Sequence, residues 1–81
     1  MKVKAFALVN ANHNEEFYKA EMRLDMCDGS SRNVSINFDS AFNFDSVSLE
    51  RFIGDLDEIS VLKFQEILSS DDFKRDVFSY L

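Results

Sequence analysis

The spacing of hydrophobic residues changes near residue 45, and this change divides the chain into two parts. Before it, apolar and polar residues alternate, which predicts strands near 2–10, 16–27 and 32–39. After it, apolar residues recur every three or four positions, which predicts helices near 46–57, 59–69 and 71–80. The order predicts one α+β domain spanning residues 1–81: a three-stranded antiparallel meander followed by two or three helices packed on one face.

The regular alternation over residues 17–27 decides that this segment is a strand. Charged residues occupy nearly every second position, and a helix would scatter them around its whole circumference. The following Asp28-Gly29 suggests a hairpin, but a two-residue turn would place the apolar residues of the two strands on opposite faces. We therefore expect a loop of three residues (28–30), or of five, which sets Leu24 opposite Val34 and Met22 opposite Ile36. The far face of this hairpin is polar and should be exposed.

The first strand is apolar on both sides. Phe6 and Leu8 lie on one face, while Val3 and Val9 lie on the other. This pattern is typical of a strand that is central in a sheet or covered on both sides.

In the second half, Asp45 or Ser46 is the expected N-cap of the first helix. Residues 59–65 fit either a helix or a fourth strand, and we favour a helix because Lys63–Leu68 is rich in helix-forming residues. The face of the last helix that carries Phe73 and Val77 should continue to Tyr80 or Leu81. The expected core comprises Met22, Leu24, Val34, Ile36, Phe52, Ile53, Phe64, Phe73 and Val77.

The link between the last strand and the first helix carries Phe42 and Phe44. Two phenylalanines in a link are either buried in the core or exposed to a partner, and a small domain favours the core. Phe44 could then pack against Leu49 at the start of the helix.

Composition adds little about compartment or chemistry. Cys27 is the only cysteine, so no intrachain disulfide forms, and the first residues are too short an apolar run for a signal peptide or a membrane span. We expect a cytoplasmic protein that makes no contact with a membrane.

Candidate catalytic groups lack the neighbours that catalysis requires. His13, the one histidine, has no convergent metal ligands at a recognisable spacing. Cys27 lies between Asp25 and Asp28, whose charges disfavour a reactive thiolate. The carboxylate pairs Asp55/Asp57 and Asp71/Asp72 resemble helix caps and solvated surface more than a catalytic pair. We therefore expect no enzyme, no metal and no cofactor.

The charge distribution is more informative. Residues 1–38 hold five acidic and five basic residues, whereas residues 39–81 hold ten acidic and four basic ones, so the second half carries the whole net charge of −6. This charge disfavours direct binding of nucleic acid and favours a basic protein surface. An acidic face that only keeps the protein in solution is the alternative. The candidate partner-binding residues are Asp55, Asp57, Glu58, Asp71, Asp72 and Asp76.

With these acidic residues between Asp45 and Asp76, the chain resembles, as a class, the small acidic inhibitors of phages and mobile elements, including anti-CRISPR proteins. The resemblance implies a non-catalytic inhibitor that blocks a nucleic-acid-binding surface on a larger protein or ribonucleoprotein, in the host cytoplasm if a phage encodes it. The alternative function is a small interaction or assembly module, a homodimer or an adaptor, that uses a sheet edge or exposed phenylalanines.

Overall fold

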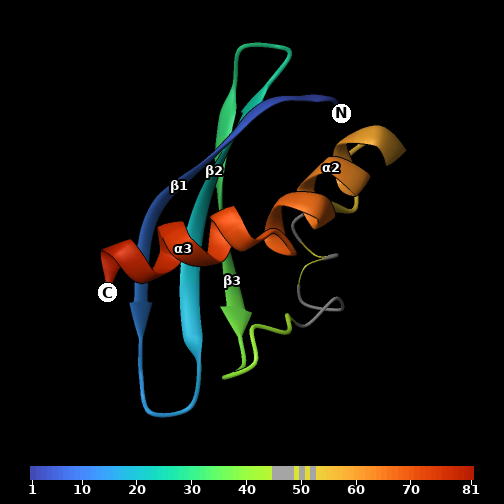
Figure 1. Cartoon of the computed structure of the whole chain (residues 1–81). Coiled ribbons are helices and arrows are strands. Elements are labelled where there is room, and N and C mark those ends of the chain that lie inside the picture. The colour runs from blue at the N-terminus through green and yellow to red at the C-terminus, as the bar shows by residue number, and fades with distance from the viewer. Residues whose placement is uncertain (45–48, 50, 52) are drawn as a thin grey trace.

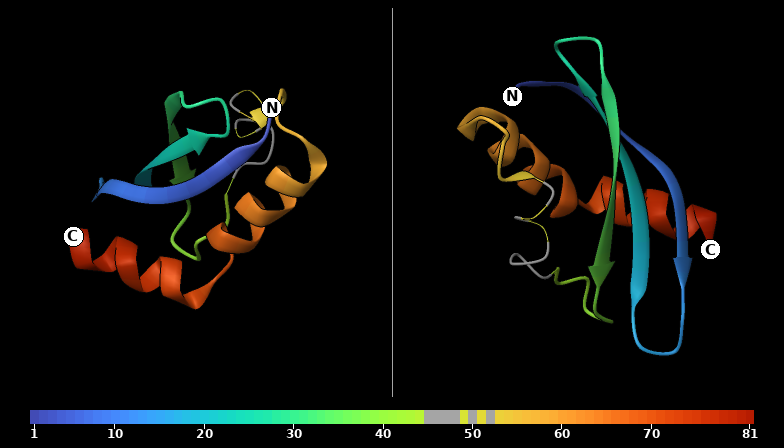
Figure 2. Two further views of the ribbon diagram at one scale, coloured as in Figure 1. Left: turned by 90° about the horizontal axis from the view of Figure 1, so that it is seen from above. Right: turned by 180° about the vertical axis from the view of Figure 1, so that it is seen from behind.

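In a computed structural model, residues 1–44, 49, 51 and 53–81 are described, and they form a sheet with helices on one side (Figure 1). The strands are β1 (Val3–His13), β2 (Tyr18–Met26) and β3 (Ser31–Phe38), which pair antiparallel in the order β1-β2-β3. Helices α2 (Glu58–Leu68) and α3 (Asp71–Tyr80) follow and lie on the same face of the sheet (Figure 2). The predicted α+β meander is confirmed, and residues 59–65 are helical.

The helix expected at 46–57 falls partly outside the described residues. The proposed caps Asp45 and Ser46 and the proposed core residue Phe52 all lie there. Leu49 and Ile53 are helical, as predicted, and both are buried, although the expected core included only Ile53. The predicted end at residue 57 was too late, because residues 54–56 form turns and bends and Asp57 has the extended backbone of the α2 N-cap.

The β2–β3 hairpin has the expected three-residue loop, but its position differs from the prediction. The Met26 amide donates to the Ser30 carbonyl at 2.8 Å, so the loop is 27–29 rather than 28–30. Leu24 therefore lies opposite Arg32, and Met22 opposite Val34, two residues away from the predicted pairs. Gly29, with a φ of 91°, fixes this position, because a left-handed residue in the third place is typical of a three-residue hairpin loop.

Strand β1 lies at an edge of the sheet, which corrects the expectation of a central or doubly covered strand. Its pairing with β2 shifts by one residue between Val3 and Ala5 and again between Leu8 and Asn10. An extra residue at each shift reverses the alternation of side chains. Val3 therefore packs in the core together with Phe6 and Leu8, although the simple alternation placed it on the other face.

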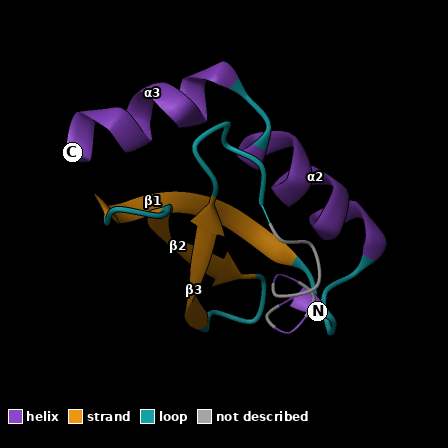
Figure 3. Cartoon of the chain, turned by 90° about the horizontal axis from the view of Figure 1, so that it is seen from below, coloured by secondary structure: helices purple, strands orange, loops and turns teal. Residues whose placement is uncertain are grey.

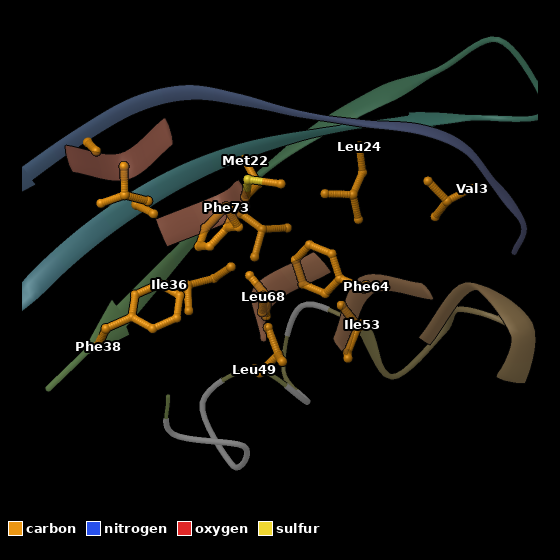
Figure 4. Packing of buried hydrophobic residues seen from close by; sticks show 14 of the residues in the cluster. Val3, Met22, Leu24, Ile36, Phe38, Leu49, Ile53, Phe64, Leu68 and Phe73 are labelled. Atoms are coloured by element: carbon orange, nitrogen blue, oxygen red, sulfur yellow. The ribbon is translucent and has the colours of Figure 1, made fainter. Parts of the chain in front are cut away.

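The core lies between the sheet and the helices (Figures 3 and 4). Each described residue of the predicted core is at most 4% exposed. The Phe64 ring of α2 stacks on Phe6 of β1, with centroids 5.3 Å apart, and the Phe73 ring of α3 lies 5.7 Å from that of Phe38. The buried face of α3 ends at Val77, because Tyr80 and Leu81, which we expected to continue that face, are 49% and 50% exposed.

Candidate interaction surfaces

Three of the six candidate carboxylates lie where the chain enters α2, and two of them already have intramolecular partners. Asp55 accepts two hydrogen bonds from the Arg32 guanidinium at 2.9 and 2.8 Å, and this contact lowers the pKa of Asp55. Asp57 caps α2 by accepting a hydrogen bond from the Ser60 amide, and contact with the Ser60 side chain together with this bond lowers the pKa of Asp57. Glu58, in the first turn, is exposed.

The other three carboxylates lie on α3. Asp71 and Asp72 occupy its first turn, after the N-cap Ser70, where negative charge is favourable next to the helix dipole. Asp72 also lies 3.5 Å from Arg75 at the surface. Asp76 is exposed one turn further along the helix. These three side chains therefore lie on the exposed surface of α3, where Asp72 pairs with Arg75.

The structure does not bring the six carboxylates into one patch. The two groups lie at opposite ends of α2, whose 11 residues span about 16 Å at 1.5 Å per residue. That distance is roughly twice the Debye length of about 8 Å at physiological salt. The two groups therefore act as separate acidic patches, here called the α2 patch (Asp55, Asp57 and Glu58) and the α3 patch (Asp71, Asp72 and Asp76).

The face of the sheet that the helices leave open carries both signs of charge. Lys19, Glu21, Arg23 and Asp25 alternate along β2 on this face, and the Arg23 Nε lies 3.3 Å from an Asp25 carboxylate oxygen. These side chains are exposed or half-buried, as predicted for a polar face. The acidic excess therefore lies on the helical side of the domain.

A third feature is a cluster of aromatic rings at the end of the sheet near the β1–β2 turn. Tyr18 stacks on His13 and on Phe42, with centroid distances of 5.3 and 5.0 Å. Phe78 of α3 closes the cluster, 5.8 Å from Tyr18 and 5.2 Å from Phe42. The rings therefore join β1, β2, the link after β3 and the last helix.

Phe42 has a left-handed backbone, with a φ of 64°. This conformation costs a residue other than glycine about 1–2 kcal/mol. The Asp39 carboxylate supports the turn by accepting from the amides of Asn43 and Ala41, both at 2.9 Å, and these bonds lower its pKa. Ring pairs contribute about 0.5–1.5 kcal/mol each, so the two contacts that Phe42 makes with Tyr18 and Phe78 offset the strain.

The link residues Phe42 and Phe44 are both partly buried and pack against the core, the use that we favoured for them. The Phe44 ring lies edge-on to Phe38 at 6.2 Å. Its expected contact with Leu49 stays a prediction.

Next to the ring cluster, a hollow of about 390 Å³ opens between the end of β1 and the end of α3. We call it the aromatic groove; its walls include Asn12, His13, Tyr18, Phe78, Tyr80 and Leu81. Phe78 and Tyr80 are each about half exposed. The Tyr80 hydroxyl donates to the Leu8 carbonyl of β1 at 3.3 Å, which fixes the ring beside the edge of the sheet.

The sequence did not single out this groove. In the alternating pattern of residues 17–27, Tyr18 belongs to the same apolar set as Met22 and Leu24, and no pattern distinguishes Phe78. The available signal was the number of apolar residues at the end of α3: Phe73 and Val77 already fill the inner face, so Phe78, Tyr80 and Leu81 exceed what one buried face of a helix holds.

The candidate chemical groups lie apart from one another. His13 is exposed at the end of β1, and Cys27 is exposed in the β2–β3 loop, at the opposite end of β2 (Figure 1). Within the described part of the chain, no three His, Cys, Asp or Glu side chains are grouped so that they could hold a metal ion. Within the same residues, no helix is long and apolar enough to cross a membrane.

No match to this chain was found among protein-family models, curated proteins or solved structures. Any functional proposal must therefore come from the surfaces described above.

Proposed function

We propose that this protein is a non-catalytic binding protein that uses acidic surface on its helical side to block a basic, nucleic-acid-binding surface of a larger protein or ribonucleoprotein. The observation that carries the proposal is the separation of charge: the open sheet face is mixed, whereas exposed carboxylates gather at the starts of α2 and α3. A summed negative field of this kind steers encounters with basic proteins and repels nucleic acid.

The two acidic patches are not equal candidates for contact. The Asp55 charge is compensated by Arg32, and the Asp57 carboxylate holds the start of α2. Glu58 and the α3 patch are therefore the better candidates for contact with a partner, because their charges contribute less to the folded structure. Exposed ion pairs contribute only about 0–1 kcal/mol each, so several carboxylates must act together.

The test compares two double charge reversals that change the net charge equally. One variant carries Glu58→Lys and Asp72→Lys on the helical side; the control carries Glu21→Lys and Asp25→Lys on the open sheet face. Each changes the net charge from −6 to −2. Partners captured from the native host by the wild-type protein are quantified by mass spectrometry for both variants, and thermal melts confirm that both fold.

The expected result is that a basic partner is retained by the control and lost by the helical variant, with association that slows as salt increases. Saturating amounts of the protein should then displace bound nucleic acid from that partner in a fluorescence anisotropy assay. Equal capture by both variants, or nucleic acid that stays bound, would contradict the proposal.

A second function is favoured by the exposed apolar side chains at the end of α3. Phe78, Tyr80 and Leu81 are each about 50% exposed. An interaction module that pairs two copies of the chain through this end would explain them. Sedimentation equilibrium decides this point, because such a dimer persists at high salt and dissociates in a Tyr80→Ala variant.

A further inference from the structure

The accessible rings of the aromatic groove have a particular arrangement. Tyr18 is stacked against both His13 and Phe42, so its ring forms a supporting wall. Phe78 and Tyr80 also line the hollow, and each is about half exposed. These two rings therefore supply the aromatic surface that a ligand can reach.

Exposed carboxylates lie close in sequence to groove residues on two elements. Glu15 and Glu16 are exposed in the β1–β2 turn, two and three residues after the groove residue His13. Asp76 is exposed one helical turn before Tyr80, and residues four apart on a helix are neighbours on its surface. Lys74, one turn before Phe78, lines a separate hollow together with Phe42. The groove thus combines accessible aromatic rings with a carboxylate one helical turn away on α3, and two further carboxylates lie in the turn that joins β1 to β2.

This combination decides between the occupants that an apolar groove could take. A second copy of the chain also carries a net charge of −6, and nucleic acid is polyanionic, so both are repelled by the surrounding carboxylates. A cationic group is attracted by the carboxylates and also by the negative faces of aromatic rings. We propose that the aromatic groove binds an arginine side chain of a basic protein partner. This inference rests on the proposed function and names the group that the partner inserts.

Arginine fits these observations better than lysine. Its planar guanidinium is weakly hydrated and stacks on aromatic rings, while its five donors reach carboxylates at the rim. The lysine ammonium is a strongly hydrated point charge, and burying it against rings is less favourable. A guanidinium stacked on Tyr80 would have Asp76, one helical turn away on α3, as its nearest carboxylate on that helix.

The test is a nuclear magnetic resonance titration of the full chain with three blocked tripeptides, in which glycines flank arginine, lysine or citrulline. Citrulline keeps the shape of arginine and lacks its charge. We expect the arginine probe to shift amide signals at residues 11–13, 18 and 78–81, the lysine probe to bind more weakly, and the citrulline probe to give no saturable shifts.

Variants at Tyr80 then separate aromatic from merely apolar binding. Tyr80→Leu, which keeps apolar bulk, should weaken the arginine probe about two- to fivefold, the effect of one exposed cation–π contact. Tyr80→Phe keeps the ring and loses only the hydrogen bond to the Leu8 carbonyl, so it should bind the arginine probe more tightly than Tyr80→Leu does. Ile59→Ala is the matched control, because Ile59 is an apolar residue of α2 that is 60% exposed. Melts of each variant establish that it is folded.

The outcomes distinguish this inference from the function on which it rests. Equal binding of the arginine and citrulline probes, or an unchanged affinity in folded Tyr80→Leu, overturns the arginine site. Arginine shifts confined to residues 57–58 and 71–72, and abolished by reversing Glu58 and Asp72, overturn the groove while leaving the acidic-blocker proposal intact. Concentration-dependent shifts at 78–81 without any probe assign the groove to a second copy of the chain instead.

Discussion

Replacing Ser60 by alanine should destabilise the protein far more than an ordinary serine substitution. Ser60 is 2% exposed in the first turns of α2, and its hydroxyl oxygen accepts a hydrogen bond from the buried Val3 amide at 3.0 Å. This bond joins the first residue of β1 to a helix 57 positions later in the chain. Without the hydroxyl, the Val3 amide at the sheet edge loses its partner while remaining buried.

The magnitude follows from three contributions. A buried donor left without an acceptor costs about 1–3 kcal/mol. Alanine has a better helix propensity than serine, and this difference offsets about 0.5 kcal/mol of that cost. The helix cap keeps the hydrogen bond from the Ser60 backbone amide to Asp57, although the Ser60 side chain also contacts this carboxylate and its loss adds to the cost. The free energy of unfolding should therefore fall by about 1–2 kcal/mol, and the Tm by roughly 5–15 °C for a domain of this size.

Urea unfolding monitored by circular dichroism measures this change. Ser79→Ala is the control, since the exposed Ser79 hydroxyl donates to the Asp76 carbonyl and its loss leaves no buried donor without a partner. The control should change the free energy of unfolding by less than about 0.5 kcal/mol. If Ser60→Ala is as stable as Ser79→Ala, the Val3–Ser60 bond does not hold β1 to α2. Native-state hydrogen exchange at the Val3 amide gives an independent measure, because the variant should lose protection there.

Three further predictions concern acid, catalysis and the β2–β3 loop. Among the described residues, four aspartates have lowered pKa values in the folded chain, so the unfolded chain binds more protons at low pH. The urea midpoint should therefore fall as the pH drops below about 4. A constant midpoint between pH 5 and 3 would contradict this. The four are Asp28, Asp39, Asp55 and Asp57. Cys27→Ser should retain partner binding in the folded variant, because no catalytic neighbour accompanies this thiol, and loss of activity would refute the non-catalytic proposal. Gly29→Ala should lower the free energy of unfolding by about 1 kcal/mol. The cost comes from the left-handed backbone alone, because the Cβ of the new alanine would have no atom within 4 Å. An unchanged urea midpoint would contradict the left-handed conformation.

The fold class was predictable because local patterns determine it. The alternation in β2 and the helical spacing of Phe73 and Val77 each select one face for the core, and the structure uses those faces. The position of β1 was not predictable in the same way. Its two register shifts are set by pairing with β2, and the sequence of β1 alone contains no signal for where an extra residue is placed.

The candidate surfaces were predictable only in part. Charge arithmetic located the acidic half of the chain, since charge depends on composition. It did not reveal that Asp55 pairs with Arg32, 23 residues earlier, or that α2 separates the acidic residues into two patches. The aromatic groove depends on contacts between residues far apart in sequence, such as Tyr18 with Phe78, and these exist only once the helices are placed on the sheet.

The two proposed surfaces suit different stages of binding. Exposed carboxylates act at long range, so they raise the rate of association and make it sensitive to salt, while adding little to the lifetime of the complex. A half-exposed ring pair such as Phe78 and Tyr80 acts only at contact, and aromatic residues of this kind dominate the energy of interfaces and hence the rate of dissociation. Asp76 lies one turn from Tyr80, so on α3 the two effects meet on neighbouring side chains. In the α2 patch, Asp55 and Asp57 already make contacts within the protein, so this patch should act mainly on the rate of association. The end of α3 should make the contacts that determine how long the complex lasts.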